Sequence, residues 1–292
     1  EELEPRAVRG ILPLGGTILG TSRTNPLKVP DGIQTVVGQL RCHGIDALVA
    51  IGGDDTLSVA AALHDAGYPV IGVPKTIDND LSATEFCIGF DTAVGIVAQA
   101  LDRLHTTAES HHRVMVVEVM GRDTGWVATM GGLAGGADVI LIPEYPVELA
   151  EIVAHLHRRR DEGKDFSIIV VAEGVAMAGT RIGREQQDAF GHVRLADRGI
   201  GDALSRAIEA ETGFETRVTV LGHLQRGGTP STVDRIWATL LGARAAELAI
   251  AGCSGVAPVR RDGVVAVARL GELVAVQRRV PRELYELSRQ FG

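Results

Sequence analysis

The sequence predicts an open α/β protein whose mainly parallel sheets are covered by helices. Short apolar, β-branched runs alternate with helical patterns along the chain, and each run enters a polar or glycine-rich turn. Runs that are apolar throughout are typical of parallel strands that are buried on both faces. The predicted strands are residues 47–51, 70–73, 114–119, 139–142, 168–172 and 218–221.

Three of the helices between these runs have recognisable ends. The first follows Asp91, a possible N-cap, with apolar residues at helical spacing. The second has an apolar face that includes Leu149 and carries three arginines, 158–160, at its far end, which we expect to be solvated and to suit the helix dipole. The third is predicted over residues 232–251, directly before a glycine.

Other stretches favour structural interpretations over functional ones. Trp126 begins a pattern at helical spacing that is more typical of a core than of a binding site. Residues 178–191 have mixed charges and weak periodicity, so they are predicted to form a surface loop. His111 and His112 lack a third ligand at metal spacing and are predicted to lie at the surface or at an interface.

Length and composition exclude several classes of protein. A chain of 292 residues, 45% of them hydrophobic, is long enough for one large or two medium domains and too apolar to be disordered. The net charge of −8 argues against generic binding to nucleic acid. No apolar run reaches the roughly 18 residues that a membrane span needs, and the first residues do not resemble a signal peptide. Cys42, Cys87 and Cys253 are too scattered for a disulfide framework or a zinc site, and we expect small core residues in a reducing cytoplasm.

The turn after the first predicted strand reads Gly-Gly-Asp-Asp at 52–55. In open α/β sheets, ligands bind beyond the carboxyl ends of the strands. Two glycines let the backbone approach a ligand closely, and the carboxylate of Asp54 beside them suits Mg²⁺. An ordinary strand-to-helix turn with an aspartate as the helix cap explains the same residues, and the turn alone does not decide between the two.

A second turn places Lys75 and Thr76 before Asp78 and Asp80. Two neighbouring carboxylates disfavour joint ionisation, so such a pair suits one general base and one partner for a metal ion or an arginine. The alternative is a turn rich in Asp and Asn with no catalytic role.

The three later strand ends carry Gly121-Arg122, Glu173 and a segment from Arg217 to Arg226 that includes His223. The planar guanidinium group suits phosphate and carboxylate. An acid, a base and a phosphate clamp without a nucleophilic serine or cysteine indicate phosphoryl transfer, in which positioning and charge neutralisation supply most of the catalysis.

Five motifs in this order resemble the phosphofructokinase family. They are Gly-Gly-Thr-Ile-Leu-Gly-Thr-Ser-Arg at 15–23, Gly-Gly-Asp at 52–54, Pro-Lys-Thr-Ile-Asp-Asn-Asp at 74–80, Met-Gly-Arg at 120–122 and Gly-His-Leu-Gln-Arg-Gly-Gly at 222–228. The resemblance covers essentially the whole chain. Lipid and NAD kinases have similar Gly-Gly-Asp turns, but they have no use for the sugar-phosphate motifs.

The resemblance implies two Rossmann-like three-layer domains and transfer of a phosphoryl group, with Mg²⁺, to the 1-hydroxyl of fructose 6-phosphate in glycolysis. Asp78 looks like the base that takes the hydroxyl proton, and Thr76 and Arg122 match groups near the transferred phosphoryl. Asp54 matches the magnesium-associated carboxylate, and Asp80 a supporting acidic residue. The positions that match sugar-phosphate contacts are Met120, Gly121, Arg122, Glu173, His223 and Arg226, together with Arg113 and Arg217, which in the family reach the 6-phosphate from a neighbouring subunit. The positions that match donor contacts are Arg23, Gly53, Asp55 and Lys75.

The phosphoryl donor is predicted from two departures. Where ATP-dependent members have Gly-Gly-Asp-Gly, this chain has Asp55, and where many of them have a glycine before Thr-Ile-Asp-Asn-Asp, it has Lys75, one of only three lysines. Asp55 would crowd and repel the inner phosphate of a nucleotide, and Lys75 would supply a point charge for pyrophosphate. We therefore favour pyrophosphate over ATP. The regulatory site of bacterial ATP-dependent members uses several arginines, and one of those positions is His105 here, with the acidic Asp138 at a neighbouring position. This departure from the family predicts little response to effectors.

The resemblance also predicts the domain organisation. A donor-binding domain would comprise residues 1–89 and 225–275, and a sugar-phosphate-binding domain residues 90–224 and 276–292. The implied assembly is a homodimer or homotetramer with shared active sites. Family members begin with a strand and a glycine-rich phosphate loop that have no counterpart in the sequence shown. Either the sequence shown omits an N-terminal segment, or the donor domain lacks the strand and the loop. The second case favours an alternative of another class, a catalytically impaired sugar-phosphate-binding or regulatory subunit, whereas Asp54, Asp78 and Arg122 argue against it.

Overall fold

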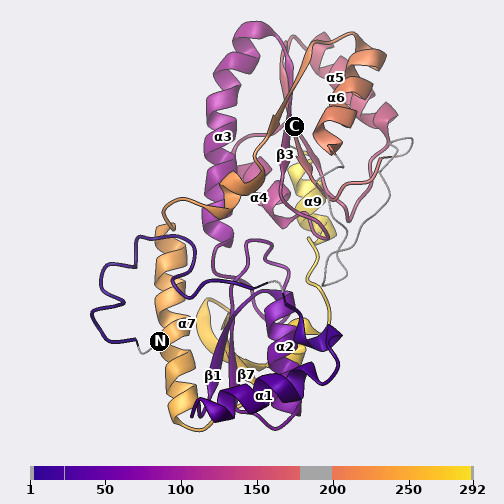
Figure 1. Cartoon of the computed structure of the whole chain (residues 1–292). Coiled ribbons are helices and arrows are strands. Elements are labelled where there is room, and N and C mark those ends of the chain that lie inside the picture. Colours follow the sequence, from indigo (N-terminus) through magenta and orange to yellow (C-terminus); the bar gives the residue numbers. More distant parts are fainter. Residues whose placement is uncertain (1–2, 23, 178–198, 291–292) are drawn as a thin grey trace. The chain divides into compact units, whose positions relative to one another are not determined.

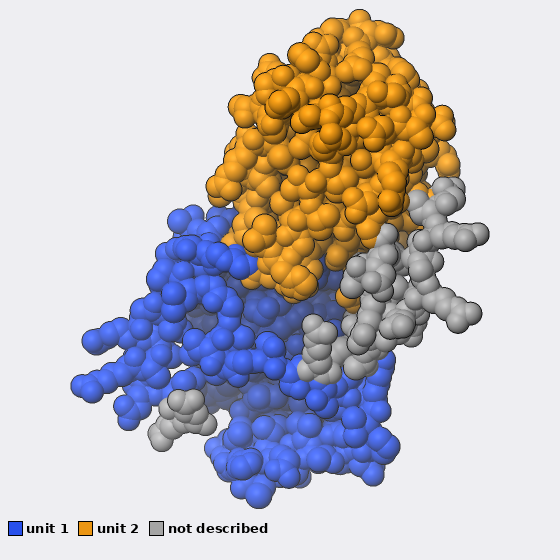
Figure 2. Space-filling model, turned by 45° about the horizontal axis from the view of Figure 1, so that its top comes forward, with its two compact units in different colours: residues 1–91, 187–192, 227–278 blue, residues 92–186, 193–226, 279–292 orange. Residues whose placement is uncertain are grey.

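The computed structural model describes residues 3–22, 24–177 and 199–290, which form two compact units (Figures 1 and 2). Unit 1 comprises residues 3–22, 24–91 and 227–278 of the described chain, and unit 2 comprises residues 92–177, 199–226 and 279–290. The assignment of the phosphoryl donor to one unit and the sugar phosphate to the other stays a prediction.

Unit 1 is built on a four-stranded sheet in the order β1-β2-β7-β8. β1, β2 and β7 are parallel, and β8 pairs with β7 in the antiparallel direction. The elements of this unit are η1 (Pro26–Lys28), α1 (Gly32–Cys42), β1 (Leu48–Gly52), α2 (Asp54–Asp65), β2 (Val70–Pro74), α7 (Thr232–Ile250), β7 (Val256–Arg261), β8 (Val264–Arg269) and α8 (Leu270–Val274).

Helices cover both faces of the unit 1 sheet. Successive side chains of β2 point to opposite faces, so Val70 packs in a core with α1, α2 and α8, whereas Ile71 and Val73 pack with α7. The largest buried side chains of the α7 core include Leu241, and those of the opposite core include Leu57. Unit 1 therefore has three layers, with β2 buried at every position.

Unit 2 is built on a four-stranded sheet in the order β4-β5-β3-β6, and all of its pairs are parallel. Figure 1 shows α3 and the pair α5 and α6 on opposite faces of this sheet. α4 packs closely against α3, since a Cβ on Gly131 would lie 2.6 Å from Cγ1 of Val97. Its elements are α3 (Phe90–His111), whose first two residues belong to unit 1, β3 (Val114–Val119), α4 (Trp126–Ala134), β4 (Val139–Leu141), α5 (Leu149–Asp161), β5 (Ser167–Ala172), α6 (Ile200–Thr212), β6 (Thr216–Val220), η2 (Gly222–Arg226) and α9 (Arg282–Ser288).

The predicted α/β class with mainly parallel sheets is confirmed, and all six predicted strands are present within two residues of their predicted ends. The prediction that every run is buried on both faces is wrong for β1 and β6. Val49 and Ile51 in β1 are 38% and 49% exposed, and Val220 in β6 is 54% exposed. Both strands lie at the edge of their sheets, where helices cover less of the surface. The β7–β8 hairpin was not predicted, although β8 contains a continuous apolar run at residues 264–268.

The helix predictions hold except for the cap at Asp91 and for the arginines at the end of α5. α7 begins at Thr232, as predicted, the apolar face that includes Leu149 lies in α5, and Trp126 is buried at the start of α4. Asp91 is not an N-cap, because α3 already begins one residue earlier and Asp91 lies in its first turn. No described helix has the length and apolar character needed to cross a membrane. The predicted surface loop at 178–191 lies outside the described residues.

The arginines at the end of α5 are not all solvated. Arg159 is 6% exposed, its Nη2 lies 2.5 Å from Oδ1 of Asp138, and its Nε donates to Oγ of Ser167 at 3.1 Å. Asp138 also accepts a hydrogen bond from the backbone N–H of Ile168 at 2.7 Å, and burial raises the pKa of this carboxyl. A buried guanidinium needs a partner of this kind, and periodicity alone does not reveal one.

The cysteine prediction is correct for one residue of three. Cys87 is fully buried, and burial raises the pKa of its thiol to about 12. Cys42 and Cys253 are exposed. Cys42 is the last residue of α1, and Cys253 lies just beyond the end of α7, so neither is in a core.

Candidate active site

The turn after β1 begins a helix at the carboxyl edge of the unit 1 sheet. Gly53 is the N-cap of α2, and Asp54 and Asp55 lie in the first turn of this helix. Asp54 is therefore the first helical residue and not the cap, which corrects one of the two interpretations of this turn. The free N–H groups and the dipole at a helix N-terminus favour anions, including acidic side chains.

The turn after β2 lies beside the turn after β1. The two parallel strands pair from Leu48 with Val70 to Gly52 with Pro74, so the turns that follow them leave the sheet at the same edge. The N–H of Lys75 donates to the carbonyl of Gly52 at 2.9 Å, and a Cβ on Gly53 would lie 3.2 Å from Cβ of Thr76. The predicted donor-side residues of both turns are thus brought together.

A hydrogen-bonded pair fixes the carboxylate of Asp78. The hydroxyl of Thr76 donates to Oδ2 of Asp78 at 3.1 Å and accepts from the N–H of Asp78 at 3.2 Å. The same threonine therefore sets both the backbone and the side chain of Asp78. A carboxylate held in this way is pre-oriented as a proton acceptor.

Asp80 is the second carboxylate of this turn. Its Oδ2 accepts from Nε2 of Gln277 at 2.8 Å, and Asn79 between the two aspartates has a left-handed backbone with φ of 52°. Burial, followed by the charge of Asp78, raises the pKa of Asp80 to about 6, and the Gln277 hydrogen bond opposes this rise. Like charges held close together have this effect on at least one member of a pair.

Asp80→Asn is expected to change how stability depends on pH. Because folding raises the pKa of Asp80, its stabilising contribution is full below about pH 4 and is lost as the pH rises through about 6. The variant lacks this loss, so relative to the wild type its free energy of unfolding should rise by up to about 3 kcal/mol between pH 4 and pH 7. Urea unfolding of both proteins with a chelator present measures the difference. A similar rise for Asp65→Asn, at the exposed end of α2, would contradict the assignment to Asp80.

The carboxyl edge of the unit 2 sheet gathers the predicted sugar-phosphate residues. β3 pairs with β5 up to Val119 with Ala172 and with β6 up to Glu118 with Val220, so the residues that follow these three strands leave at one edge. The residues placed there are Met120, Gly121, Arg122, Glu173, His223 and Arg226.

Gln225 ties two parts of this edge together. It is 1% exposed, its Oε1 accepts from the N–H of Met120 at 3.2 Å, and its Nε2 donates to the carbonyl of Gly222 at 3.1 Å. His223 and Arg226 on the same short helix remain exposed. A buried glutamine thus holds two exposed side chains at the end of β3.

The turn that carries Arg122 packs tightly against the end of β5. The N–H of Gly174 donates to the carbonyl of Gly121 at 3.0 Å, and a Cβ on Gly174 would overlap with the carbonyl oxygen of Arg122. On the other side, the Glu144 carboxylate accepts from the N–H of Gly125 at 3.0 Å with each oxygen.

Gly174→Ala is expected to displace the Arg122 turn and to lower kcat by about tenfold, because small displacements of a positioned group are costly in catalysis. The measurement is the kcat of the phosphoryl transfer proposed below, beside Gly95→Ala as the control, where a Cβ would meet no atom within 4 Å. Equal activity of the two variants would contradict the role of the close approach at Gly174.

Arg113 and Arg217 lie at the opposite edge of the same sheet. Arg113 directly precedes β3, and Arg217 is the second residue of β6. Both guanidinium groups contact Oε1 of Glu215, that of Arg113 through Nη2 at 2.8 Å, and hydrogen bonding from Arg113 lowers the pKa of this carboxyl. At about 3.3 Å per residue, Arg113 lies about 23 Å along β3 from Met120, and Arg217, which pairs with Met115, lies about 17 Å from that end of the strand. The prediction that Arg217 lies at a carboxyl strand end is therefore wrong, since β6 begins at Thr216.

The five strand ends that carry the candidate residues do not share one edge. The five strands belong to two sheets, β1 and β2 in unit 1 and β3, β5 and β6 in unit 2, so there are two edges instead of one. Arg23 lies outside the described residues. The contacts of Gln225, Glu144 and Gln277 were not predicted, because the sequence gives no signal for hydrogen bonds between distant parts of the chain.

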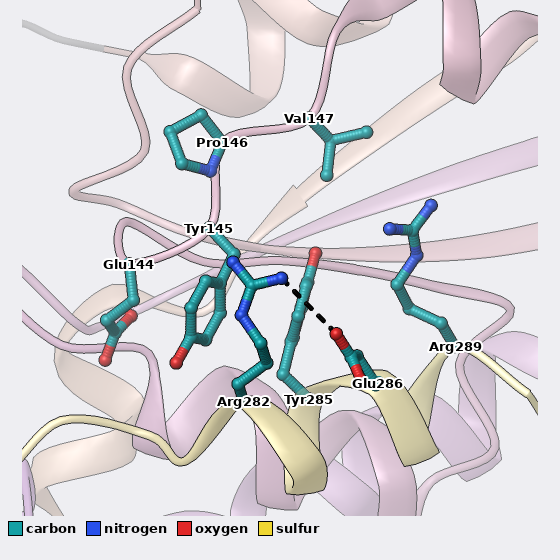
Figure 3. A pocket seen from close by; sticks show the side chains of 8 residues that line it. All are labelled: Glu144, Tyr145, Pro146, Val147, Arg282, Tyr285, Glu286 and Arg289. Atoms are coloured by element: carbon teal, nitrogen blue, oxygen red, sulfur yellow. Dashed lines mark hydrogen bonds and ion pairs between the residues drawn. The ribbon is translucent and has the colours of Figure 1, made fainter.

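Two further observations concern possible ligands. Unit 2 has a pocket between residues 144–147 and α9, where Tyr145 stacks on Tyr285 and Arg282 pairs with Glu286 at 3.3 Å (Figure 3). None of the predicted site residues lines this pocket. Within the described ranges, no group of three or more histidine, cysteine, aspartate or glutamate side chains is arranged to hold a metal ion.

Comparison with known proteins identifies relatives over nearly the whole chain. A family model described as Phosphofructokinase matches residues 1–249. A pyrophosphate–fructose 6-phosphate 1-phosphotransferase of Streptomyces coelicolor is 50% identical over 287 residues, which cover 97% of this chain and 83% of the relative. An ATP-dependent 6-phosphofructokinase 2 of the same organism is 46% identical over 283 residues, which cover 96% of this chain and 82% of the relative.

Solved structures agree with these relatives. A pyrophosphate-dependent phosphofructokinase from Marinobacter aquaeolei has a TM-score of 0.80 at 26% identity, over 96% of this chain and 71% of that one. The phosphofructokinase of Saccharomyces cerevisiae has a TM-score of 0.77 at 32% identity, over 94% of this chain and 38% of that one. On the family match, the identity and the shared fold, this chain belongs to the phosphofructokinase family.

Proposed function

We propose that this protein transfers a phosphoryl group from pyrophosphate to the 1-hydroxyl of fructose 6-phosphate and forms fructose 1,6-bisphosphate in glycolysis. The observation that carries the proposal is the Thr76–Asp78 pair, held at the same sheet edge as the turn of Gly53, Asp54 and Asp55. A pre-oriented carboxylate beside an anion-favouring helix N-terminus suits phosphoryl transfer. The relatives named as pyrophosphate-dependent phosphotransferases support the same reaction.

In this mechanism Asp78 takes the proton of the 1-hydroxyl while the sugar oxygen forms a bond to phosphorus. The bridging P–O bond of pyrophosphate breaks, and inorganic phosphate leaves. Thr76 keeps the carboxylate of Asp78 oriented, and Arg122 neutralises charge on the transferred group.

Asp54 suits the Mg²⁺ that the reaction would require. Mg²⁺ is usually bound by one or two carboxylates together with substrate phosphates, so the absence of a larger acidic cluster among the described residues is compatible with it. The exposed first turn of α2 presents Asp54 as one such carboxylate. When bound, the ion would neutralise charge on the phosphates.

Two residues favour pyrophosphate as the donor. Asp55 in the first turn of α2 would repel the inner phosphate of a nucleotide, and Lys75 at the neighbouring turn would add a compact positive charge. ATP is the alternative donor, and the relative named as ATP-dependent at 46% identity keeps it in consideration.

The sugar phosphate is proposed to bind at the carboxyl edge of the unit 2 sheet. Arg113 and Arg217 share Glu215 at the far edge, which supports their contribution from a neighbouring subunit to its 6-phosphate. The assembly would then be a homodimer or homotetramer with shared active sites, in which unit 1 binds the donor. We place this enzyme in the cytoplasm.

A donor comparison tests this proposal. With Mg²⁺ and fructose 6-phosphate, pyrophosphate is expected to support turnover far better than ATP, measured by coupling fructose 1,6-bisphosphate to aldolase and NADH oxidation. Equal or better rates with ATP would overturn the donor assignment. Binding of fructose 6-phosphate without turnover from either donor would favour the sugar-phosphate-binding or regulatory subunit instead.

A further inference from the structure

A segment of unit 1, which we call the strap (residues 273–278), runs beside the loop that follows Thr76, here called the acidic loop (residues 76–84). The N–H of Ser82 donates to the carbonyl of Leu273 at 3.0 Å, and the hydroxyl of Ser82 donates to the carbonyl of Val276. The N–H of Arg278 donates to the carbonyl of Asp80 at 2.7 Å. Two segments that are about 190 residues apart in sequence are thus joined along their backbones.

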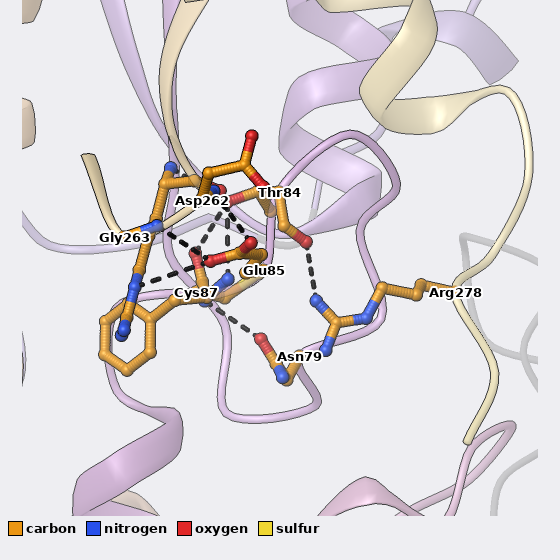
Figure 4. A network of polar contacts seen from close by, with 9 residues as sticks. Asn79, Thr84, Glu85, Cys87, Asp262, Gly263 and Arg278 are labelled. Atoms are coloured by element: carbon orange, nitrogen blue, oxygen red, sulfur yellow. Dashed lines mark hydrogen bonds and ion pairs between the residues drawn. The ribbon is translucent and has the colours of Figure 1, made fainter. Parts of the chain in front are cut away.

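The guanidinium group of Arg278 fixes the far end of the acidic loop. Its Nη1 donates to the carbonyl of Thr84 at 2.5 Å (Figure 4). Burial lowers the pKa of Arg278, whose side chain is half-buried in unit 1. Arg278 therefore bonds to the acidic loop with both its backbone and its side chain.

The chain beyond the acidic loop is held by the β7–β8 hairpin. The N–H of Glu85 donates to the carbonyl of Arg260 at 2.9 Å, and the Glu85 carboxylate accepts from the N–H groups of Asp262 at 2.8 Å and Gly263 at 3.4 Å (Figure 4). Asn79 in turn accepts from the N–H of Cys87 at 3.0 Å. The ends of the acidic loop are therefore fixed by contacts that involve no carboxylate of Asp78 or Asp80.

The contact made by Gln277 differs from these because its side chain hydrogen-bonds to a carboxylate of the candidate site. Its Nε2 donates to Oδ2 of Asp80 at 2.8 Å, and Asp80 lies two residues from Asp78 across the left-handed turn at Asn79. Gln277 is exposed and Asp80 is half-buried, so water can replace the lost amide as a hydrogen-bond donor, but water cannot tie the Asp80 carboxylate to the strap. Without this tie, the turn that carries Asp78 would be held less firmly.

We propose that Gln277 is a positioning residue, whose side-chain amide holds the Asp80 carboxylate and thereby the turn that orients Asp78. This inference rests on the function proposed above. It assigns a role in the reaction to a residue that lies 197 positions from Asp80 in the sequence. Small displacements of a catalytic group lower kcat strongly, whereas binding of the sugar phosphate at the unit 2 edge would be little affected.

The first test replaces Gln277 by Met, which has a similar length and no amide. We expect kcat to fall about tenfold and the KM for fructose 6-phosphate to stay within about twofold. The control is Val276→Ala in the same strap, since the Val276 side chain is 69% exposed and its carbonyl remains available to Ser82. An unchanged kcat in Gln277→Met, or an equal loss in the control, would overturn the proposal.

The second test separates positioning from general loss of stability. In an Asp80→Ala background, Gln277→Met should change kcat by less than about twofold, because the partner of the amide is already gone. A tenfold loss in both backgrounds would show that Gln277 acts elsewhere and would overturn the proposal.

The third test does not depend on catalysis. Hydrogen exchange of the substrate-free protein should be faster in residues 76–84 of Gln277→Met and unchanged in Val276→Ala. Asp80→Ala should give the same acceleration, with no further increase in the double variant. Unchanged exchange in Gln277→Met would overturn the positioning role, whereas a wild type without turnover would overturn only the proposed reaction.

Discussion

Asp78→Asn is expected to lower kcat by about 10²–10⁴-fold with either phosphoryl donor. The amide cannot take the proton of the sugar hydroxyl, although it can still accept the hydrogen bond that Thr76 donates to the native carboxylate at 3.1 Å. The fold of the loop should therefore remain, and the loss should lie in kcat rather than in binding of fructose 6-phosphate. Steady-state kinetics with both donors, together with thermal unfolding, measure these quantities.

Asp65→Asn is the matched control for Asp78→Asn. It removes one aspartate charge from the same unit at the exposed end of α2, far along the helix from Asp54. Its kcat should stay within about twofold of the wild type. A near-normal kcat in Asp78→Asn, or a rise in KM without any fall in kcat, would refute the assignment of Asp78 as the base.

Asp55→Gly combined with Lys75→Gly is expected to exchange the preference for the two donors. Removing the side chain in the first turn of α2 relieves repulsion of the inner phosphate of a nucleotide, and removing the lysine takes away a positive charge that favours pyrophosphate. We expect kcat/KM for pyrophosphate to fall by about 10²-fold and that for ATP to rise by about tenfold, which corresponds to about 1–3 kcal/mol for each change. Neither position has a positive φ, and the N–H of Lys75 that bonds to Gly52 is kept.

The single variants and a charge-matched pair complete this test. Asp55→Gly alone should raise kcat/KM for ATP, and Lys75→Gly alone should lower kcat/KM for pyrophosphate. Lys28→Gly with Asp65→Gly removes the same two charges from exposed positions of unit 1 and should leave the ratio of donors unchanged. An equal shift in that pair would mean that overall charge, and not the two turns, sets the donor.

The sequence predicted the strands and the turns that follow them because both depend on neighbouring residues. A continuous apolar run such as 168–172 indicates a strand, and β5, which lies inside its sheet, is buried at every position. Thr76 and Asp78 could likewise be recognised together, because a spacing of two residues lets a hydroxyl and a carboxylate meet within one turn.

Other features of the site depend on contacts between distant parts of the chain. Arg217 and Arg226 are nine residues apart, yet the former lies at the amino edge of its sheet and the latter beyond the carboxyl edge, because β6 begins at Thr216. Arg159 ends a helix like its exposed neighbour Arg158, yet it is buried because Asp138 and Ser167 lie opposite it.

The sequence by itself determined the α/β class, the order of the strand-end motifs and the residue types that suit phosphoryl transfer. Only the tertiary structure decided that β1 and β2 form one edge while β3, β5 and β6 form another, and that Gln277 meets Asp80. The physical reason is that apolar periodicity and turn chemistry act over a few residues. Strand neighbours and buried polar partners are instead selected by packing over the whole unit, where each buried donor or acceptor requires a partner from any part of the chain.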